Sequence, residues 1–166
     1  DGQIFLEKDL FNSGIRPAIN ESLSVSRVGS SAQIKSMKKV SSTLKLYQSQ
    51  YKELEIFAKL GSDMDKSTME IINNGKRNVE ILKQKAFYPY KISYQIAILY
   101  IITKNFLQKV PIKDIKFFEE EYLLILKEKY SNVLESLEKD IFDKKITNIL
   151  EMVALELITK YQNINQ

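Results

Sequence analysis

Two residue types that carry much of protein chemistry, cysteine and histidine, are absent from this 166-residue sequence. The absence of cysteine excludes disulfides and thiolate metal sites, and the absence of histidine excludes most zinc sites and most catalytic triads. Only carboxylates, lysines, tyrosines and hydroxyl side chains remain for chemistry. The composition therefore disfavours an enzyme that is complete within these residues.

Long apolar runs are also lacking. The most apolar stretch, IAILYII at residues 96–102, is far shorter than the ~20 residues that a membrane-spanning helix needs. The first residues carry acidic side chains and no basic leader, which predicts that they are not a signal peptide. They also lack an initiator methionine, so we expect a fragment of a longer chain.

A strong charge of one sign is missing too. The net charge is +4 and the pI is near 9.0, but the excess is small and the lysines are interleaved with glutamates. We therefore expect no nucleic-acid partner. The alternative that the residues leave open is a free-standing basic helical module, which would bind nucleic acid or an acidic protein through Lys35, Lys38 and Lys39.

The hydrophobic pattern changes near residue 33. Residues 2–7 and 22–28 have the short patterns of strands, with a turn at 12–17 between them. From residue 32 onward the apolar residues recur at three- and four-residue spacing, which predicts helices. The expected helical segments are 45–60, 62–84 with a cap at Ser62 or Asp63 and a bend at Gly75, 93–107, 114–130 and 144–161.

The same spacing predicts which side chains are buried. Leu46, Tyr51 and Phe57 are expected on one stripe, whereas the run Glu119–Glu121 is expected to form a solvated helix face rather than a metal site. Two short strands cannot close a sheet of their own, but the helices can pack as a bundle. The predicted fold class is mainly α, with a C-terminal helical bundle preceded by the last strands of another domain.

Two segments near the start, DGQIFLEKDLFNSGIRPAIN and LSVSRVGSSAQIKSMKKV, resemble sequences of the α subunits of the F-type ATP synthase. Three further segments follow in the order and at the spacing of that family, namely GSDMDK (61–66), EILKQ (80–84) and VPIKDIKFFEEEYL (110–123). The resemblance covers the whole chain, weakens in its last part, and leans towards bacterial members.

The resemblance implies a division of the chain near residue 33. Residues 1–33 would be the end of a RecA-like α/β nucleotide-binding domain, and residues 34–166 would be the α-helical C-terminal domain. The implied protein is the non-catalytic, regulatory α subunit of a proton-translocating ATP synthase. In that complex three α and three β subunits alternate in a ring around the central-stalk γ subunit, and a peripheral stalk is attached.

The resemblance also implies a cofactor and a location. The expected cofactor is ATP or ADP with Mg²⁺, whose phosphate and metal ligands would lie outside these residues. The expected location is peripheral, on the cytoplasmic face of the bacterial inner membrane, or on an organellar membrane in a non-bacterial member.

Arg27 lies at the end of the second expected strand, where a charge is out of place unless it meets an anion. The strand pattern alone favours a structural salt bridge at a domain junction. The resemblance implies instead a catalytic role, as the arginine finger that α sends into the neighbouring β site. A guanidinium suits this role because its forked donors match phosphate oxygens.

Arg16, Pro17 and Gln84 form the second implied site. By resemblance they line the adenine pocket of the non-catalytic nucleotide site of α. The sequence departs from the family at Ala86, where many members carry a second glutamine, so the second amide contact is expected to be absent. It departs again at Glu21–Ser22, where Val-Gly is usual, and this places an acid close to Arg27 in sequence.

No G-x-x-x-x-G-K-[ST] phosphate-binding loop occurs in these residues. We therefore expect no ATP hydrolysis by this chain alone, although it would be part of an ATPase complex. A third possibility is a degenerate or split α subunit that supports the complex without contributing to catalysis.

Overall fold

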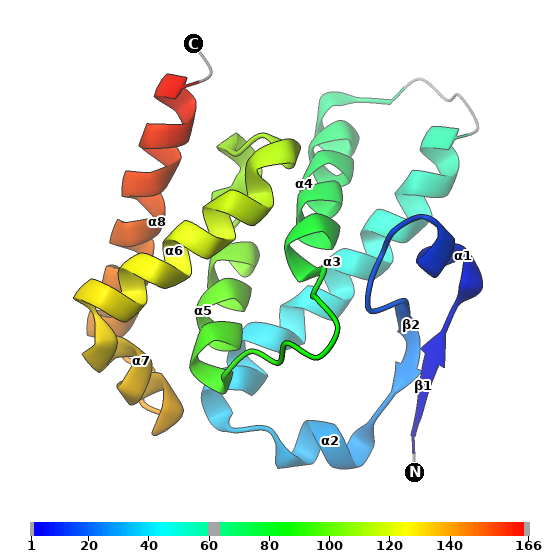
Figure 1. The fold of residues 1–166 in the computed structure, drawn as a ribbon. Coiled ribbons are helices and arrows are strands. Elements are labelled where there is room, and N and C mark those ends of the chain that lie inside the picture. The colour runs from blue at the N-terminus through cyan, green and yellow to red at the C-terminus, as the bar shows by residue number, and fades with distance from the viewer. Residues whose placement is uncertain (1, 60–63, 165–166) are drawn as a thin grey trace.

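The computed structural model describes residues 2–59 and 64–164 (Figure 1). In the first of these ranges strand β1 (Gln3–Leu6) pairs antiparallel with strand β2 (Ile19–Val25), and the short helix α1 (Lys8–Asn12) lies between them in sequence. Leu6 is opposite Ile19 and Phe5 is opposite Asn20, with an irregularity before Phe5. This hairpin is the whole sheet within the described residues.

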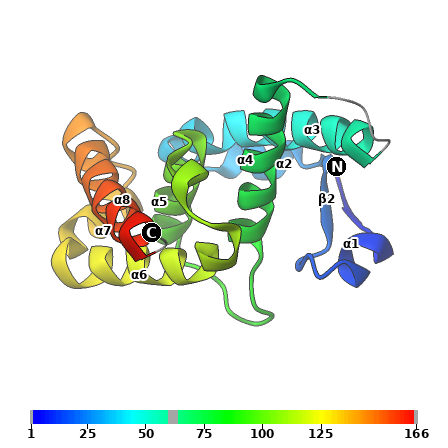
Figure 2. The same ribbon diagram turned by 90° about the horizontal axis from the view of Figure 1, so that it is seen from above.

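The remainder of the described chain is mostly helical, as the spacing predicted, with an irregular segment at residues 83–91. The elements in order are α2 (Arg27–Ala32), α3 (Lys35–Lys59), α4 (Lys66–Leu82), α5 (Ile92–Thr103), the 3₁₀ turns η1 (Phe106–Lys109) and η2 (Ile112–Asp114), α6 (Ile115–Lys129), α7 (Ser131–Glu138) and α8 (Lys144–Ile164). Figures 1 and 2 show α3 to α8 packed as a bundle, with the hairpin and α8 on opposite sides of the molecule. The predicted mainly α fold class is confirmed.

The apolar core lies around α5, α6 and α8. Helix α5 is apolar on most sides, and Ile96, Ala97 and Ile101 have no exposed surface. The predicted stripes of α6 and α8 are also buried, including Phe118 and Leu150. A helix that is apolar all round must be enclosed by its neighbours, which explains the central place of α5.

The predicted stripe of α3 is only partly correct. Tyr51 is buried, but Leu46 and Phe57 are more than half exposed, and the polar side chain of Gln48 is buried instead. Helix α3 contacts α5, α4 and β2, so several of its faces are in contact with other elements. The spacing of apolar residues identifies one average apolar face of a helix. It cannot show which residues of α3 contact each of its three neighbours.

Gly75 does not bend its helix, which was the expectation from sequence. Helix α4 runs without a break from Lys66 to Leu82. A Cβ atom at Gly75 would lie 2.2 Å from Cγ and Cδ2 of Tyr51 on α3. The glycine is therefore required because two helices approach closely, and not because the backbone turns.

Element boundaries correct two further predictions. Strand β2 ends at Val25, and Ser26 caps α2 by accepting a hydrogen bond from the amide of Gly29 at 3.2 Å, so residues 27–28 are helical and not extended. The caps predicted at Ser62 and Asp63 lie outside the described residues. Helix α4 begins at Lys66, where the side chain of Asp65 accepts from the amide of Thr68.

Candidate functional site

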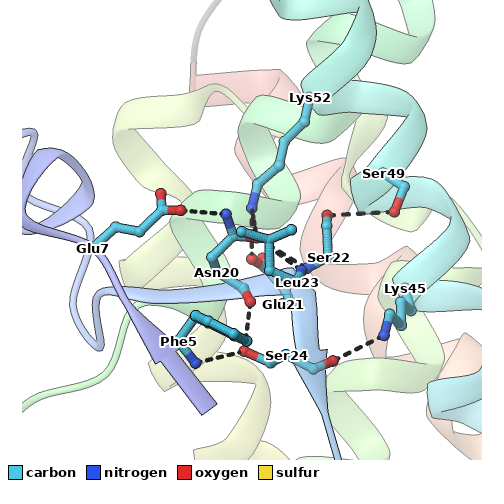
Figure 3. A network of polar contacts seen from close by, with 10 residues as sticks. All are labelled: Phe5, Glu7, Asn20, Glu21, Ser22, Leu23, Ser24, Lys45, Ser49 and Lys52. Carbon is cyan, nitrogen blue, oxygen red and sulfur yellow. Dashed lines mark hydrogen bonds and ion pairs between the residues drawn. The ribbon is translucent and has the colours of Figure 1, made fainter. Parts of the chain in front are cut away.

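Helix α3 holds strand β2 through a row of polar side chains, shown in Figure 3. Lys45, Ser49 and Lys52 lie four and three residues apart, which places them on one face of the helix. The ammonium group of Lys52 donates to Asn20 Oδ1 at 3.1 Å and to Glu21 Oε2 at 3.0 Å. We call this row, with its partners on β2, the polar seam.

The other two contacts of the polar seam lie further along β2. Ser49 Oγ donates to Ser22 Oγ at 3.4 Å, and Lys45 Nζ donates to the backbone oxygen of Ser24 at 3.0 Å. Glu21 and Ser22 are therefore both members of the seam. The acid at position 21 is an ion-pair partner of Lys52.

Within the hairpin, Asn20 is the central polar group. Its Nδ2 donates to Glu7 Oε1 at 2.6 Å, and its Oδ1 accepts from the amides of Ser22 and Leu23 (Figure 3). Its backbone oxygen accepts from Ser24 Oγ at 2.5 Å. Asn20 thus contacts Glu7, which follows β1, and also Lys52 on α3. Strand β2 is therefore held by polar contacts to two different elements.

Arg27 is the first residue of α2, two residues after the end of β2 at Val25. Upstream of it, Lys45 holds the backbone of Ser24. Downstream, the carboxylate of Asp140 in the α7–α8 corner accepts from the amides of Lys35 and Ser36 at 3.1 and 2.7 Å, at the start of α3. Hydrogen bonds from Ser36 lower the pKa of Asp140, so the carboxylate stays ionised. Helix α2, which begins with Arg27, is thus preceded and followed by backbone that side chains from other helices or corners hold in place.

The Arg27 side chain borders an open depression at the surface of the hairpin. The other residues that line it are Gly2, Gln3, Phe5, Leu23 and Val25. The depression thus combines apolar side chains, the amide of Gln3 and the permanent cation of Arg27.

Arg16, Pro17 and Gln84 are brought together although they are far apart in sequence. The amide of Gln84, just after the end of α4, donates to the backbone oxygen of Arg16 at 2.8 Å. The Arg16 guanidinium lies 4.3 Å from the centre of the Phe11 ring, and the Arg16–Pro17 peptide bond is cis. Gln84 Nε2 donates to the backbone oxygen of Tyr88 at 2.6 Å.

The two groups of predicted residues are separate in space. Arg16 and Pro17 precede β2 and Arg27 follows it, so they lie at opposite ends of this strand (Figure 1). At about 3.3 Å per residue, a strand of seven residues places them roughly 20 Å apart. The arrangement can therefore serve two different ligands, and it does not form a single pocket.

Glu119 is buried, contrary to the expectation from the sequence. It is 1% exposed, although a solvated face was expected for Glu119–Glu121. A signal for burial was present, because Glu119 is four residues after Ile115 and three before Tyr122, on the buried stripe of α6. Burial raises the pKa of its carboxyl, opposed by the neighbouring Lys116.

The described residues, 2–59 and 64–164, were compared with the requirements of a metal site and of a membrane-spanning helix. Among these residues there is no group of three or more acidic, histidine or cysteine side chains that could hold a metal ion. In the same ranges, no helix combines the length and the apolar character required to cross a bilayer.

Comparison with known proteins gives a family for most of the chain. Residues 33–157 match the family described as "ATP synthase alpha/beta chain, C terminal domain". Residues 1–32 lie outside this match and contain both strands of the hairpin.

Curated relatives extend the similarity over nearly the whole chain. A protein of Flavobacterium johnsoniae named ATP synthase subunit alpha is 55% identical over 97% of this chain. Proteins of the same name from Christiangramia forsetii and Azobacteroides pseudotrichonymphae are 55% and 49% identical over 98% and 93% of it. The chain spans 31%, 31% and 30% of the length of these three relatives, which are all bacterial.

Proposed function

This chain belongs to the family of ATP synthase alpha and beta chains through its C-terminal domain, and from that premise we propose that it acts in two nucleotide sites of an ATP synthase. In the first, Arg27 serves as an arginine finger in the catalytic site of a neighbouring β subunit. In the second, Arg16, Pro17 and Gln84 close the non-catalytic nucleotide pocket of α on its adenine side.

The observation that carries the first role is the anchoring of the turn around Arg27. Lys45 fixes the strand before it and Asp140 fixes the helix after it. During phosphoryl transfer, negative charge develops on the transferred group, and a guanidinium supplied by another subunit stabilises it. A finger works only if its base is held, because an imprecise donor loses most of its effect.

The backbone hydrogen bond between Gln84 and Arg16 supports the second role. It joins the segment after α4 to the loop before β2, so the residues expected to contact adenine come from both proposed parts of the chain. A planar guanidinium, a proline ring and an amide together offer two flat surfaces and one hydrogen-bonding edge. Phosphate and Mg²⁺ would be bound by residues outside this chain.

The proposal includes an assembly and a domain division. Residues 1–33 would complete a RecA-like domain, and residues 34–166 would form the helical domain of the α subunit. The partners would be β subunits alternating with α in a ring, the central-stalk γ subunit and the peripheral stalk. Such a complex would lie at the cytoplasmic face of the bacterial inner membrane, with this chain in its peripheral part.

The decisive experiment replaces Arg27 with lysine in the full-length α subunit of the assembled complex. Lysine keeps the charge but loses the planar fork, so ATP hydrolysis is expected to fall steeply, towards the ~10³–10⁵-fold that a finger in trans contributes. Arg16→Lys is the matched control, because it should weaken nucleotide binding at the non-catalytic site and leave most of the turnover. Unchanged turnover in assembled Arg27→Lys complexes would instead favour a degenerate or split α subunit that supports the complex without contributing to catalysis.

A further inference from the structure

The side chains of three lysines at the start of α3 take no part in either proposed nucleotide site. Lys35, Lys38 and Lys39 are all exposed, and their spacing alone does not show whether they face solvent or an acidic partner. The fold places a second basic segment beside them. Asp140, in the corner between α7 and α8, accepts from the backbone amides of Lys35 and Ser36 at 3.1 and 2.7 Å.

The corner between α7 and α8 is itself basic. The ring of Phe142 in this corner lies 5.2 Å from Lys39 Nζ, measured to the ring centre, so the corner and the start of α3 share a surface. Residues 139–145 bring three more exposed lysines to this place, namely Lys139, Lys144 and Lys145. We call the six lysines, three from each segment, the basic corner.

The basic corner accounts for the net charge of the whole molecule. Residues 35–39 and 139–145 contain six lysines and two aspartates, a net charge of +4, and the complete chain also has a net charge of +4. The remaining residues are therefore neutral in sum. A net charge that is concentrated at one place attracts partners of the opposite sign more strongly than the same charge spread over the surface.

The acids of this region are engaged by the fold itself. Asp140 holds the start of α3, and Asp143 accepts from the backbone amide of Ile146 at 2.9 Å, at the start of α8. Glu138, the preceding acid in the chain, accepts from Ser93 Oγ at 3.0 Å. These carboxylates satisfy backbone and hydroxyl donors, and they do not serve mainly as partners of the lysines.

The six ammonium groups have no such carboxylate partners. Within the described residues, none of them forms a salt bridge. Lys38 Nζ donates to the backbone oxygen of Ser31 at 2.9 Å. The pKa of Asp140 is lowered chiefly by its hydrogen bonds from Ser36 and least by the charge of Lys35. The positive charge of the corner is therefore open to carboxylates from another chain.

One apolar side chain and two acids decide which kind of partner fits. Ile141 is 46% exposed in the middle of the corner segment. Protein interfaces combine an apolar centre with a polar rim, and charges at the rim steer the association. Asp140 and Asp143 would repel the continuous phosphates of nucleic acid or of an anionic lipid surface, whereas a protein partner can place single carboxylates opposite single lysines.

We propose that the basic corner is a docking surface for an acidic segment of another subunit, and that one apolar side chain of this segment covers Ile141. The inference rests on the proposed assembly with other subunits, but on neither of the two nucleotide roles. It also gives a function to Lys35, Lys38 and Lys39 within a complex, without a free-standing basic module.

Carbodiimide cross-linking of the purified complex tests the docking surface directly. The reagent joins a lysine amine to a carboxylate as an amide, with loss of water, where the two groups are in contact. Mass-spectrometric mapping is expected to find lysines of the basic corner joined to a segment of another subunit that is rich in Asp and Glu. Products that join these lysines only to acids of this chain, or no products, would overturn the inference.

Lys144→Glu combined with Lys145→Glu is the decisive variant. Both residues lie in the first turn of α8, where acidic side chains favour the helix, so the fold is expected to persist. The probe is a fluorescent peptide of repeated Glu-Glu-Leu-Glu units, and its affinity for the full-length α subunit should fall ~tenfold at low salt. The difference should shrink as salt is added. An unchanged affinity would contradict the docking surface.

Lys109→Glu combined with Lys113→Glu is the matched control. These two exposed lysines precede α6, whereas the basic corner follows α7, and the change in charge is the same (Figure 1). The control is expected to bind the acidic peptide as the unchanged chain does. An equal loss in both variants would show that net charge alone attracts the peptide, and the docking surface would be wrong.

Two further probes distinguish the partner class. Duplex DNA and vesicles of phosphatidylglycerol with phosphatidylcholine should bind the corner variant and the Lys109/Lys113 control equally. If the corner variant loses DNA or vesicle binding and keeps peptide binding, the corner takes phosphate groups, and the inference is overturned. A complex that loses turnover with Arg27→Lys but gives no cross-link at the corner would retain the proposed function and refute only this inference.

Discussion

The helical bundle and the β1–β2 hairpin are held by different kinds of contact. In the bundle, side chains such as Ile96, Ile101 and Leu150 are completely enclosed. In the hairpin, Leu6 is 73% exposed and Leu23 is 55% exposed, and the attachment to α3 is the polar seam. The bundle can be stabilised by its own apolar core, whereas the hairpin has apolar surface that nothing in the described chain covers. This difference is what the edge of a second domain would show.

Removal of a core side chain should have the largest effect on stability. Leu150→Ala is expected to lower the free energy of unfolding by ~2–5 kcal/mol, because it leaves a cavity in a fully buried site. The matched change in the hairpin, Leu6→Ala, is expected to stay within ~0.5 kcal/mol in this chain. Urea unfolding followed by circular dichroism measures both, and equal effects would show that the hairpin belongs to the same cooperative core.

The close approach of α3 and α4 gives the second prediction. Gly75→Ala would favour a helix intrinsically, but its Cβ would clash with the Tyr51 ring. We expect a net loss of ~1–3 kcal/mol from overpacking. A more stable variant in the same unfolding experiment would show that the two helices separate easily, and the bundle would then be less rigid than its packing indicates.

The pH dependence of stability reports on the buried carboxyl of Glu119. Burial raises the pKa of Glu119, so the folded chain keeps this proton to higher pH than the unfolded chain does. Its contribution to stability is therefore complete below the ordinary carboxyl pKa and is lost as the pH rises through the folded value. Unfolding free energies measured from pH 4 to pH 7 should decline less in Glu119→Gln than in the unchanged chain. An equal decline in the two chains would contradict this prediction.

The polar seam should give the smallest effect. A double-mutant cycle with Glu21→Gln and Lys52→Met is expected to yield a coupling of ~0.2–1 kcal/mol, because both side chains are partly exposed. The coupling should weaken as salt is added. A coupling of several kcal/mol, insensitive to salt, would instead mean that the seam is as strongly integrated as the core.

Local patterns predicted much of this fold and part of the site. The apolar repeats of α5, α6 and α8 are long and regular, so both the helices and their buried positions could be predicted. Helix α7 was missed because it has only eight residues. The contact between Gln84 and Arg16 could not follow from periodicity, since it joins distant segments. The resemblance to a known family suggested it.

The order of polar and apolar residues is enough to make this chain mainly helical with a strand-like beginning, because these tendencies depend on neighbours within a turn or two. The burial of Glu119, the exposure of Leu46 and the need for glycine at position 75 depend instead on which helices meet. One helix face can point to solvent or to another helix with the same local pattern. Packing between segments far apart in the chain resolves that choice, and it also brings Lys116 to the end of α4.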